Sequence, residues 1–296
     1  MREELKKLLE KTLFFKYSIP NKDLALSVNL SSCQDDCFTY SSDLNLAELI
    51  YQSILDYSYN EFELNSKDFN TLFNKALQNK IKYKKKQDEI TKIKYGFYGE
   101  VLLYSILYSF YNSKPIISRG YFYNPLENSE TKGYDSYHLV ENENNIELWF
   151  GEVKFRDSLY SGAKSAIDGL VKAFSDEYLT NNFIAMENHS NNFNLSGTKI
   201  EKILEEWDGT DINILEQIKK HNMILIYPIL LVYSDSSICY EDKIKNAINK
   251  INSKFTKKNY SLSIESELFF IFLPVNEVKK IKKEVIKWIE LGKPQI

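Results

Sequence analysis

The sequence predicts an α/β fold in which a mixed central sheet is flanked by helices, with a mainly helical N-terminal part. Apolar residues recur at three- and four-residue steps through the first third of the chain, which is typical of amphipathic helices. Short extended segments follow from residue 116, and helix and strand patterns alternate in the last third. The chain has 296 residues, 43% of them hydrophobic and 27% charged, so it is long enough and apolar enough to bury a full core.

The N-terminal part, residues 1–95, contains three helix patterns. They cover residues 3–15, 46–57 and 67–93. No Pro- or Gly-rich linker separates this part from residues 96–296. The two parts are therefore either separate regions or one compact unit.

The second part opens with a helix and continues as a cluster of strands. Gly96 and Gly99 flank Phe97 and Tyr98, and an apolar helix is expected over residues 100–111 with Glu100 in its first turn. After this helix, strands are expected over residues 116–118, 121–123, 135–140 and 146–155.

Helices and strands alternate over the rest of the chain. Helix patterns cover residues 161–178, 196–207, 212–221, 241–255 and 275–291. Two apolar strands, over residues 224–233 and 268–273, lie among them. That order favours a mixed sheet covered by helices.

The overall charge excludes a generally basic nucleic-acid-binding protein. With 38 basic and 41 acidic residues the net charge is −3, so any polyanion site must be local. One candidate is the segment from Lys80 to Lys94, which has seven lysines and two acids; the plainer interpretation is a solvated helix face. Only three of the basic residues are arginines: Arg2, Arg119 and Arg156.

A cytoplasmic protein without a membrane span is expected. The longest apolar run, from Met223 to Tyr233, is interrupted by Pro228 and is shorter than the roughly 20 residues that cross a bilayer. The N-terminus lacks the apolar segment of a secretory signal. Three cysteines cannot form a disulfide framework, which agrees with a reducing compartment.

The segment from residue 132 to 156 carries the most informative chemistry. Polar residues 141–145 between two strand patterns predict a β-hairpin. If the turn centres between Glu143 and Asn144, Asp135 lies opposite Glu152, and their Cβ atoms are about 4.5–5.5 Å apart. Alternation puts Lys154 and Arg156 on the same face as Glu152. It points Trp149, Val153 and Phe155 the other way, into the core.

Two carboxylates at that distance can hold one hard cation, Mg²⁺ or Mn²⁺. Such an ion is usually bound by one or two carboxylates together with waters and phosphate oxygens. Lys154 would then orient a water or stabilise charge on a phosphate, and Glu100 could supply a further acid. The alternative is an acid pair and a lysine in a surface salt bridge on an amphipathic hairpin.

Other candidate chemistries have less support. His138 follows Asp135 by three residues, so alternation puts it on the opposite face, as a hydrogen-bonded structural histidine. Cys33 and Cys37 lack a second Cys or His pair for a structural zinc site. With His189 and His221 isolated and no Gly-x-Ser-x-Gly motif, a serine hydrolase has no support.

Four motifs occur in order over about residues 96–175. They are Gly99-Glu100-Val101-Leu102-Leu103-Tyr104, Lys132-Gly133-Tyr134-Asp135 with His138-Leu139, Leu148 through Phe155 with Gly151-Glu152-Val153-Lys154, and the helix from Ala163 through Ile167. In these residues, and in Phe269 through Pro274, the chain resembles the PD-(D/E)xK nuclease superfamily. More narrowly, it resembles the HamA family, the nuclease component of the Hachiman anti-phage defence system.

The resemblance implies a restriction-endonuclease-like core over about residues 96–180 and metal-dependent hydrolysis of DNA phosphodiester bonds. It implies Asp135 and Glu152 as metal ligands, Lys154 as the catalytic lysine, and Glu100 as the acidic residue of the core helix. Tyr134 stands where the superfamily often has proline. Weaker candidates for contact with the nucleic-acid backbone are Lys132, Arg156, Arg119, Lys84, Lys85 and Lys86.

The resemblance also implies a partner, a HamB-like helicase encoded alongside. No P-loop motif is present in this chain, so an ATP-driven motor would be another polypeptide. Two alternatives remain open. One is a catalytically silent adaptor of nuclease fold that docks a helicase or nucleic acid, and the other is an enzyme of the same fold that cleaves RNA.

Overall fold

The computed structural model describes residues 1–19, 30–32, 35–64, 68–124, 126–127, 129–130, 132–207, 213–256 and 259–296. These residues form an eight-stranded mixed sheet in the order β1-β2-β10-β9-β7-β6-β3, and β8 continues beyond β7 along β9. The α/β prediction is confirmed. The strands are β1 (Leu13–Ile19), β2 (Asp35–Tyr40), β3 (Lys114–Pro115), β6 (His138–Glu141), β7 (Ile146–Trp149), β8 (Glu152–Phe155), β9 (Met223–Ser234) and β10 (Ser266–Val275); β4 (Tyr123–Asn124) and β5 (Ser129–Glu130) make a separate two-stranded sheet.

The centre of the sheet is parallel and its two edges are antiparallel. β10 pairs in parallel with β2 and β9, and β9 pairs in parallel with β7 and then β8. The pairs β1/β2, β6/β7 and β3/β6 are antiparallel. β9 and β10 are buried along almost their whole length, which explains why both consist of continuous apolar residues rather than an alternating pattern.

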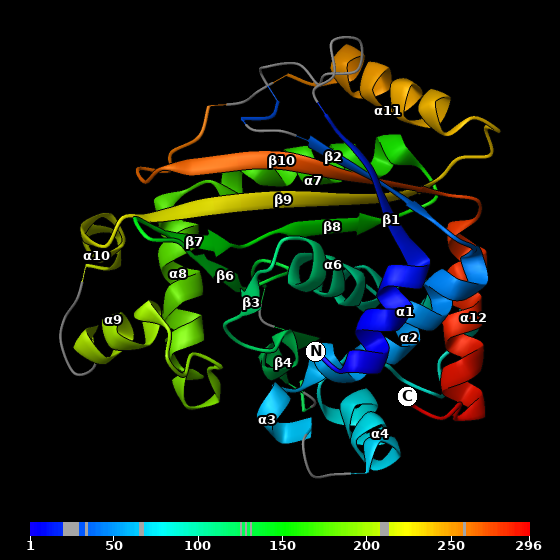
Figure 1. The fold of residues 1–296 in the computed structure, drawn as a ribbon, viewed down its shortest axis with the longest axis horizontal. Coiled ribbons are helices and arrows are strands. Elements are labelled where there is room, and N and C mark those ends of the chain that lie inside the picture. The colour runs from blue at the N-terminus through cyan, green and yellow to red at the C-terminus, as the bar shows by residue number, and fades with distance from the viewer. Residues whose placement is uncertain are drawn as a thin grey trace.

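Helices cover both faces of the sheet (Figure 1). Side chains of α1, α2, α6 and α12 form the core on one face, and those of α7, α8 and α11 form it on the other. No helix in the described ranges is long and apolar enough to cross a membrane. The helices are α1 (Glu3–Thr12), α2 (Asp43–Ser58), α3 (Glu61–Leu64), α4 (Phe69–Asn79), α5 (Glu89–Ile93), α6 (Phe97–Phe110), η1 (Arg119–Phe122), α7 (Leu159–Ala173), α8 (Asp176–Glu187), η2 (Ser190–Asn192), α9 (Lys199–Trp207), α10 (Ile214–Lys220), α11 (Tyr240–Lys254) and α12 (Val278–Leu291).

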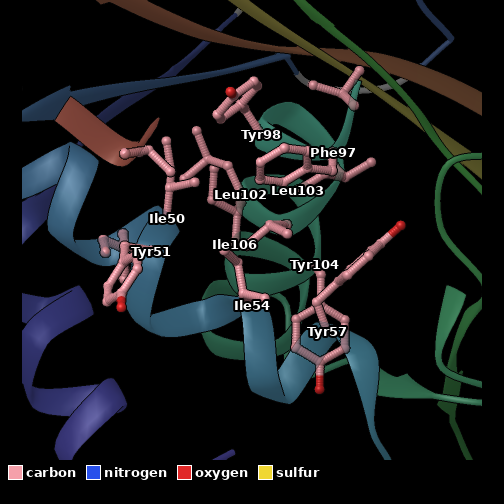
Figure 2. Packing of buried hydrophobic residues seen from close by; sticks show 14 of the residues in the cluster. Ile50, Tyr51, Ile54, Tyr57, Phe97, Tyr98, Leu102, Leu103, Tyr104 and Ile106 are labelled. Carbon is pink, nitrogen blue, oxygen red and sulfur yellow. The ribbon is translucent and has the colours of Figure 1, made fainter. Parts of the chain in front are cut away.

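The packing of α2 against α6 joins the N-terminal part to the rest of the chain. Figure 2 shows Ile50 and Ile54 of α2 beside Leu102 and Ile106 of α6, and all four are fully buried. β2 of the N-terminal part also pairs with β10, so residues on both sides of position 95 share one sheet and one core. The division at residue 95 remains a prediction.

The N-terminal part contains two strands that the sequence did not predict. The helix expected over residues 3–15 ends at Thr12, and β1 begins at Leu13 and pairs with β2. The segment from Leu13 continues the apolar spacing of the helix, but its aromatic residues also suit a strand, and pairing with β2 decides the outcome. The helix expected over 67–93 is two helices, α4 and α5; residue 67 lies outside the described residues.

Four further expected elements differ from the prediction. Residues 116–118 are not a strand, and residues 121–123 fall mainly in η1. The helix expected over 161–178 is two helices, because Ser175 accepts a hydrogen bond from the Tyr178 N–H at 3.2 Å and starts α8. The strand expected over 146–155 is interrupted at Phe150 and Gly151, which separates β7 from β8.

Gly151 is required at that interruption. A Cβ atom there would lie 2.7 Å from the backbone oxygen of Pro228 and 2.8 Å from its Cγ. Because the carbonyl belongs to the central strand β9, it has little room to move. Only glycine therefore lets the chain pass so close to β9 where β7 ends and β8 begins.

Replacing Gly151 with alanine should destabilise the protein by about 1–3 kcal/mol, through the clash with Pro228. The matched control is Gly169→Ala, in the exposed part of α7, where a Cβ atom meets nothing within 4 Å. That change should be neutral or stabilise by up to about 1 kcal/mol, because alanine is the better helix former. Urea denaturation of both variants measures the difference; equal stability of the two would contradict the role given to Gly151.

Candidate active site

The candidate site lies at the open edge of β8. Among the described strands β8 pairs with β9 alone, because β6 ends before it reaches β8. The Val153 N–H donates instead to the Asp135 carboxylate, with 2.9 Å between Val153 N and Asp135 Oδ2. The side chain of Asp135 thus takes the position of a missing neighbouring strand and satisfies a backbone donor of the edge.

The residues around Asp135 are fixed to the interruption between β7 and β8. The Asp135 N–H donates to the Gly151 carbonyl at 2.9 Å. The Ser136 hydroxyl accepts from the Gly151 N–H at 2.8 Å and donates to the Trp149 carbonyl at 3.3 Å. The Tyr134 N–H donates to the Tyr137 hydroxyl at 3.1 Å. These bonds place the Asp135 carboxylate with little freedom.

The predicted pairing of Asp135 with Glu152 needs a correction. The predicted register is found between β6 and β7, where His138 pairs with Trp149 and Glu141 with Ile146. It does not extend to Asp135, because the pairing of β6 with β7 stops at His138 and Trp149. Asp135 instead contacts residues 151 and 153, on either side of Glu152.

Glu152 and Lys154 form an ion pair on β8. The Lys154 ammonium donates to Glu152 Oε1, and the two side chains are 18% and 21% exposed, respectively. α7 packs closely over the lysine, because a Cβ atom at Gly162 would lie only 3.4 Å from Lys154 Cβ. Because both side chains are largely buried, the Lys154 ammonium has few positions to take.

Lys154 also interacts electrostatically with Asp135. Burial lowers the pKa of Lys154, while the charges of Asp135 and, less strongly, Glu100 raise it. Burial raises the pKa of Asp135, which the charge of Lys154, the hydrogen bond from Val153 and the charge of Arg119 oppose. Lys154 is therefore paired with Glu152 and also interacts through its charge with Asp135.

Helix α6 brings Glu100 to the same edge from the other face of the sheet. Gly99 allows the close approach, because a Cβ atom there would lie 2.9 Å from Val153 Cγ2 and 3.4 Å from Phe155 Cβ. Glu100 Oε2 accepts a hydrogen bond of 2.5 Å from the Tyr57 hydroxyl of α2. Figure 2 shows Tyr57 beside Tyr104 of α6 at this end of the shared core.

These groups line one cleft of about 800 Å³ between α5, α6, β8 and α12. Glu100, Asp135, Lys154 and Arg156 are among the residues that line it; Glu152 is not, but it contacts Lys154. Three of the four predicted catalytic residues thus share a cavity, and the fourth is joined to it by an ion pair.

A family model for HamA matches residues 9–289, nearly the whole chain. The chain belongs to the HamA family. HamA is a component of the Hachiman defence system. No curated protein and no solved structure matches the chain.

The predicted ligands of this HamA chain are carboxylates, the oxygen donors that a small, hard cation prefers. Asp135 uses Oδ2 for the Val153 N–H, and its Oδ1 has no hydrogen bond from the described residues. Glu152, which precedes Val153 on β8, is the second carboxylate of the predicted pair and is bound to Lys154. No group of three His, Cys, Asp or Glu side chains that could hold a metal occurs in the described ranges. Two carboxylates with waters and phosphate oxygens nevertheless suffice for Mg²⁺.

The weaker candidates for backbone contact are dispersed. Arg156 lines the cleft, and its guanidinium lies 3.4 Å from the Ser161 carbonyl. Arg119 is buried, 7% exposed, with its guanidinium 5.1 Å from the centre of the Phe122 ring, so it acts on Asp135 through its charge. Lys132 lines a separate cavity of about 390 Å³ beside α8. Lys84, Lys85 and Lys86 are exposed in the loop before α5 and do not line the cleft.

Sequence reasoning missed the contribution of α12 to the cleft. Lys279, Lys282 and Lys283 line it, together with Lys94 at the end of α5. Their spacing of three and four residues puts the α12 lysines on one helix face. The spacing was visible in the sequence, but nothing local indicated that this face meets β8.

His138 is a structural residue, as predicted. Its side chain is 2% exposed, and its Nδ1 lies 3.0 Å from the Ser113 hydroxyl and 3.3 Å from the Ser113 carbonyl. Trp149, Val153 and Phe155 are buried in the core, also as predicted. Cys33 lies outside the described residues, and Cys37 is buried in β2.

His138 should contribute a loss of stability in mild acid. Burial lowers the pKa of His138 to about 3, below its ordinary 6.5. The unfolded chain therefore binds a proton as the pH falls through 6.5, whereas the folded chain does not until about pH 3. From pH 7 to pH 5 the free energy of unfolding should fall by about 2 kcal/mol more in the wild type than in His138→Gln, at roughly 1.4 kcal/mol per unit.

Urea denaturation of both proteins at the two pH values makes this measurement. Comparison with the variant is essential, because burial also raises the pKa of Asp35 to about 7, and that group has the opposite effect. The same loss of stability in wild type and variant would mean that the His138 ring is not held neutral.

Proposed function

We propose that this HamA chain is a metal-dependent nuclease that hydrolyses DNA phosphodiester bonds as the effector of a helicase-linked defence complex. The observation that carries the proposal is that Asp135, Glu152 and Lys154 meet at the open edge of β8, where Asp135 accepts the Val153 N–H and Lys154 pairs with Glu152. Membership of the HamA family, a Hachiman component, supports the defence role.

In the proposed hydrolysis, the two carboxylates and the lysine would have separate roles. Asp135 and Glu152 would hold Mg²⁺ or Mn²⁺, which when bound supplies positive charge to the phosphodiester as it reacts. Lys154 would orient the attacking water or stabilise the charge that develops on the phosphate. Binding of a cation would release Lys154 from Glu152, so the ammonium would become available only when the site is filled.

Glu100 would act as a second acid at the rim of the cleft. Its bond to Tyr57 fixes the carboxylate without neutralising it. The charge of Glu100 raises the pKa of Lys154, which favours the ammonium over the neutral amine. This position suits an acidic residue that keeps the catalytic lysine protonated until it meets substrate.

A helicase encoded alongside is the partner that the defence role implies. The chain has a net charge of −3, so its general electrostatic attraction for DNA is weak. A partner that already holds DNA would overcome this by raising the local concentration of substrate. We therefore expect low activity from the isolated chain.

Changing Glu152 and Lys154 together to alanine should reduce DNA cleavage in Mg²⁺ by roughly 100-fold or more, because an acid and an electrostatic catalyst are both lost. The fold should survive, since neither side chain belongs to a hydrophobic core. The matched control removes Lys164 and Asp168, an exposed ion pair of α7 outside the cleft, and should cleave like the wild type.

The assay uses plasmid, linear DNA and RNA, each with and without Mg²⁺. Cleavage of RNA alone would identify the chain as a ribonuclease of the same fold. Absence of cleavage under every condition, with and without the helicase, would identify a silent adaptor. Full activity of the Glu152→Ala/Lys154→Ala protein would refute the assignment of the site.

A further inference from the structure

Helix α12 forms a basic wall of the cleft. Lys279, Lys282 and Lys283 project into it, and Lys94 extends the wall from the end of α5. Two other lysines of the same helix lie elsewhere: Lys280 is 3.7 Å from Asp43, and Lys287 is 3.4 Å from Glu284. Three of the five lysines of α12 therefore share the face that lines the cleft.

Lys282 fixes the orientation of that face. It is 7% exposed, and its ammonium donates to the Phe155 carbonyl at 2.9 Å and to the Ile93 carbonyl at 3.2 Å. These bonds join α12 to the end of β8 and to the end of α5. With Lys282 held in this way, Lys279 and Lys283, three residues before it and one after, must face the opening of the cleft.

The cleft is locally positive although the chain is not. Six cationic side chains line it against four acids, whereas the whole chain has a net charge of −3. Positive charge in a recess has a larger effect than on an open surface, because the low-dielectric walls focus the field. The charge faces the place where the scissile phosphate would lie beside Lys154.

Lys279 and Lys283 are available to a ligand. Lys279 is 3.5 Å from Asp157 and Lys283 is 2.8 Å from Glu89, and the two lysine side chains are 61% and 51% exposed. Ion pairs between such exposed groups are weak and screened by salt. A phosphate can therefore replace Asp157 or Glu89 at little cost.

We propose that Lys279 and Lys283 of α12 bind the phosphate backbone of DNA on its way into the cleft. The inference rests on the nuclease function proposed above and assigns the substrate path to a surface. In this assignment the path runs along α12 and α5 toward Lys154. It does not run along the exposed loop of Lys84, Lys85 and Lys86, which does not line the cleft.

The test compares two double variants of one helix. Lys279→Gln/Lys283→Gln removes two charges from the cleft face, and Lys280→Gln/Lys287→Gln removes two charges of similar exposure from elsewhere on α12. Binding of a short DNA duplex is measured without divalent metal over a range of salt concentrations, by fluorescence anisotropy. Thermal unfolding of each protein verifies that the fold is retained.

The cleft-face pair should reduce the slope of log K against log salt by about 2, since each phosphate contact contributes roughly 0.9. Affinity near 0.1 M salt should fall roughly 10- to 100-fold. The control pair should leave the slope within about 0.5 of the wild type. Each single cleft-face variant should show about half of the double effect.

Equal effects of the two pairs, or an unchanged slope in the cleft-face pair, would overturn the inference, as would a wild-type protein that binds no DNA. Because binding is measured without metal, the result does not depend on cleavage. Cleavage of DNA with an unchanged slope would leave the nuclease function standing and remove the α12 path. The expected slopes without any cleavage in Mg²⁺ would support the α12 path and argue against the nuclease function.

Discussion

The hydrogen bond from the Val153 N–H to the Asp135 carboxylate joins the parts of the candidate site. It exists because β6 stops short of β8 and leaves the edge of β8 without a neighbouring strand. The Asp135 carboxylate fills that gap. Lys154 of β8, which is paired with Glu152, interacts with this carboxylate through its charge. One unsatisfied edge of a sheet thus places two acids and an ammonium together.

Groups from both faces of the sheet reach this edge, which is why the site can contain them all. α6 approaches β8 closely through Gly99 and brings Glu100, and α7 covers Lys154 through Gly162. α12 is attached at the end of β8 by Lys282, whose burial lowers its pKa to about 8. Gly99, Gly162 and Lys282 thus fix where these three helices meet β8.

Local patterns sufficed to predict the parts of the fold that depend on short-range order. The hairpin register, the inward direction of Trp149, Val153 and Phe155, and the structural role of His138 all follow from alternation along two strands. The ladder between β6 and β7 stops at His138 and Trp149, so alternation could not predict that Asp135 meets β8 through a bond from the Val153 N–H to its side chain. β1 was missed because its first residues continue the apolar spacing of α1. The role of α12 could not be predicted, because it depends on where the helix packs.

We propose that Asp135 and Glu152 share one divalent ion at the edge of β8. Crystals soaked in Mn²⁺ would locate such an ion by its anomalous diffraction. We expect one peak about 2.0–2.2 Å from a carboxylate oxygen of each residue, with the Lys154 ammonium moved away from Glu152. No peak there, or a peak bound to only one of the two carboxylates with the Glu152–Lys154 pair intact, would contradict it.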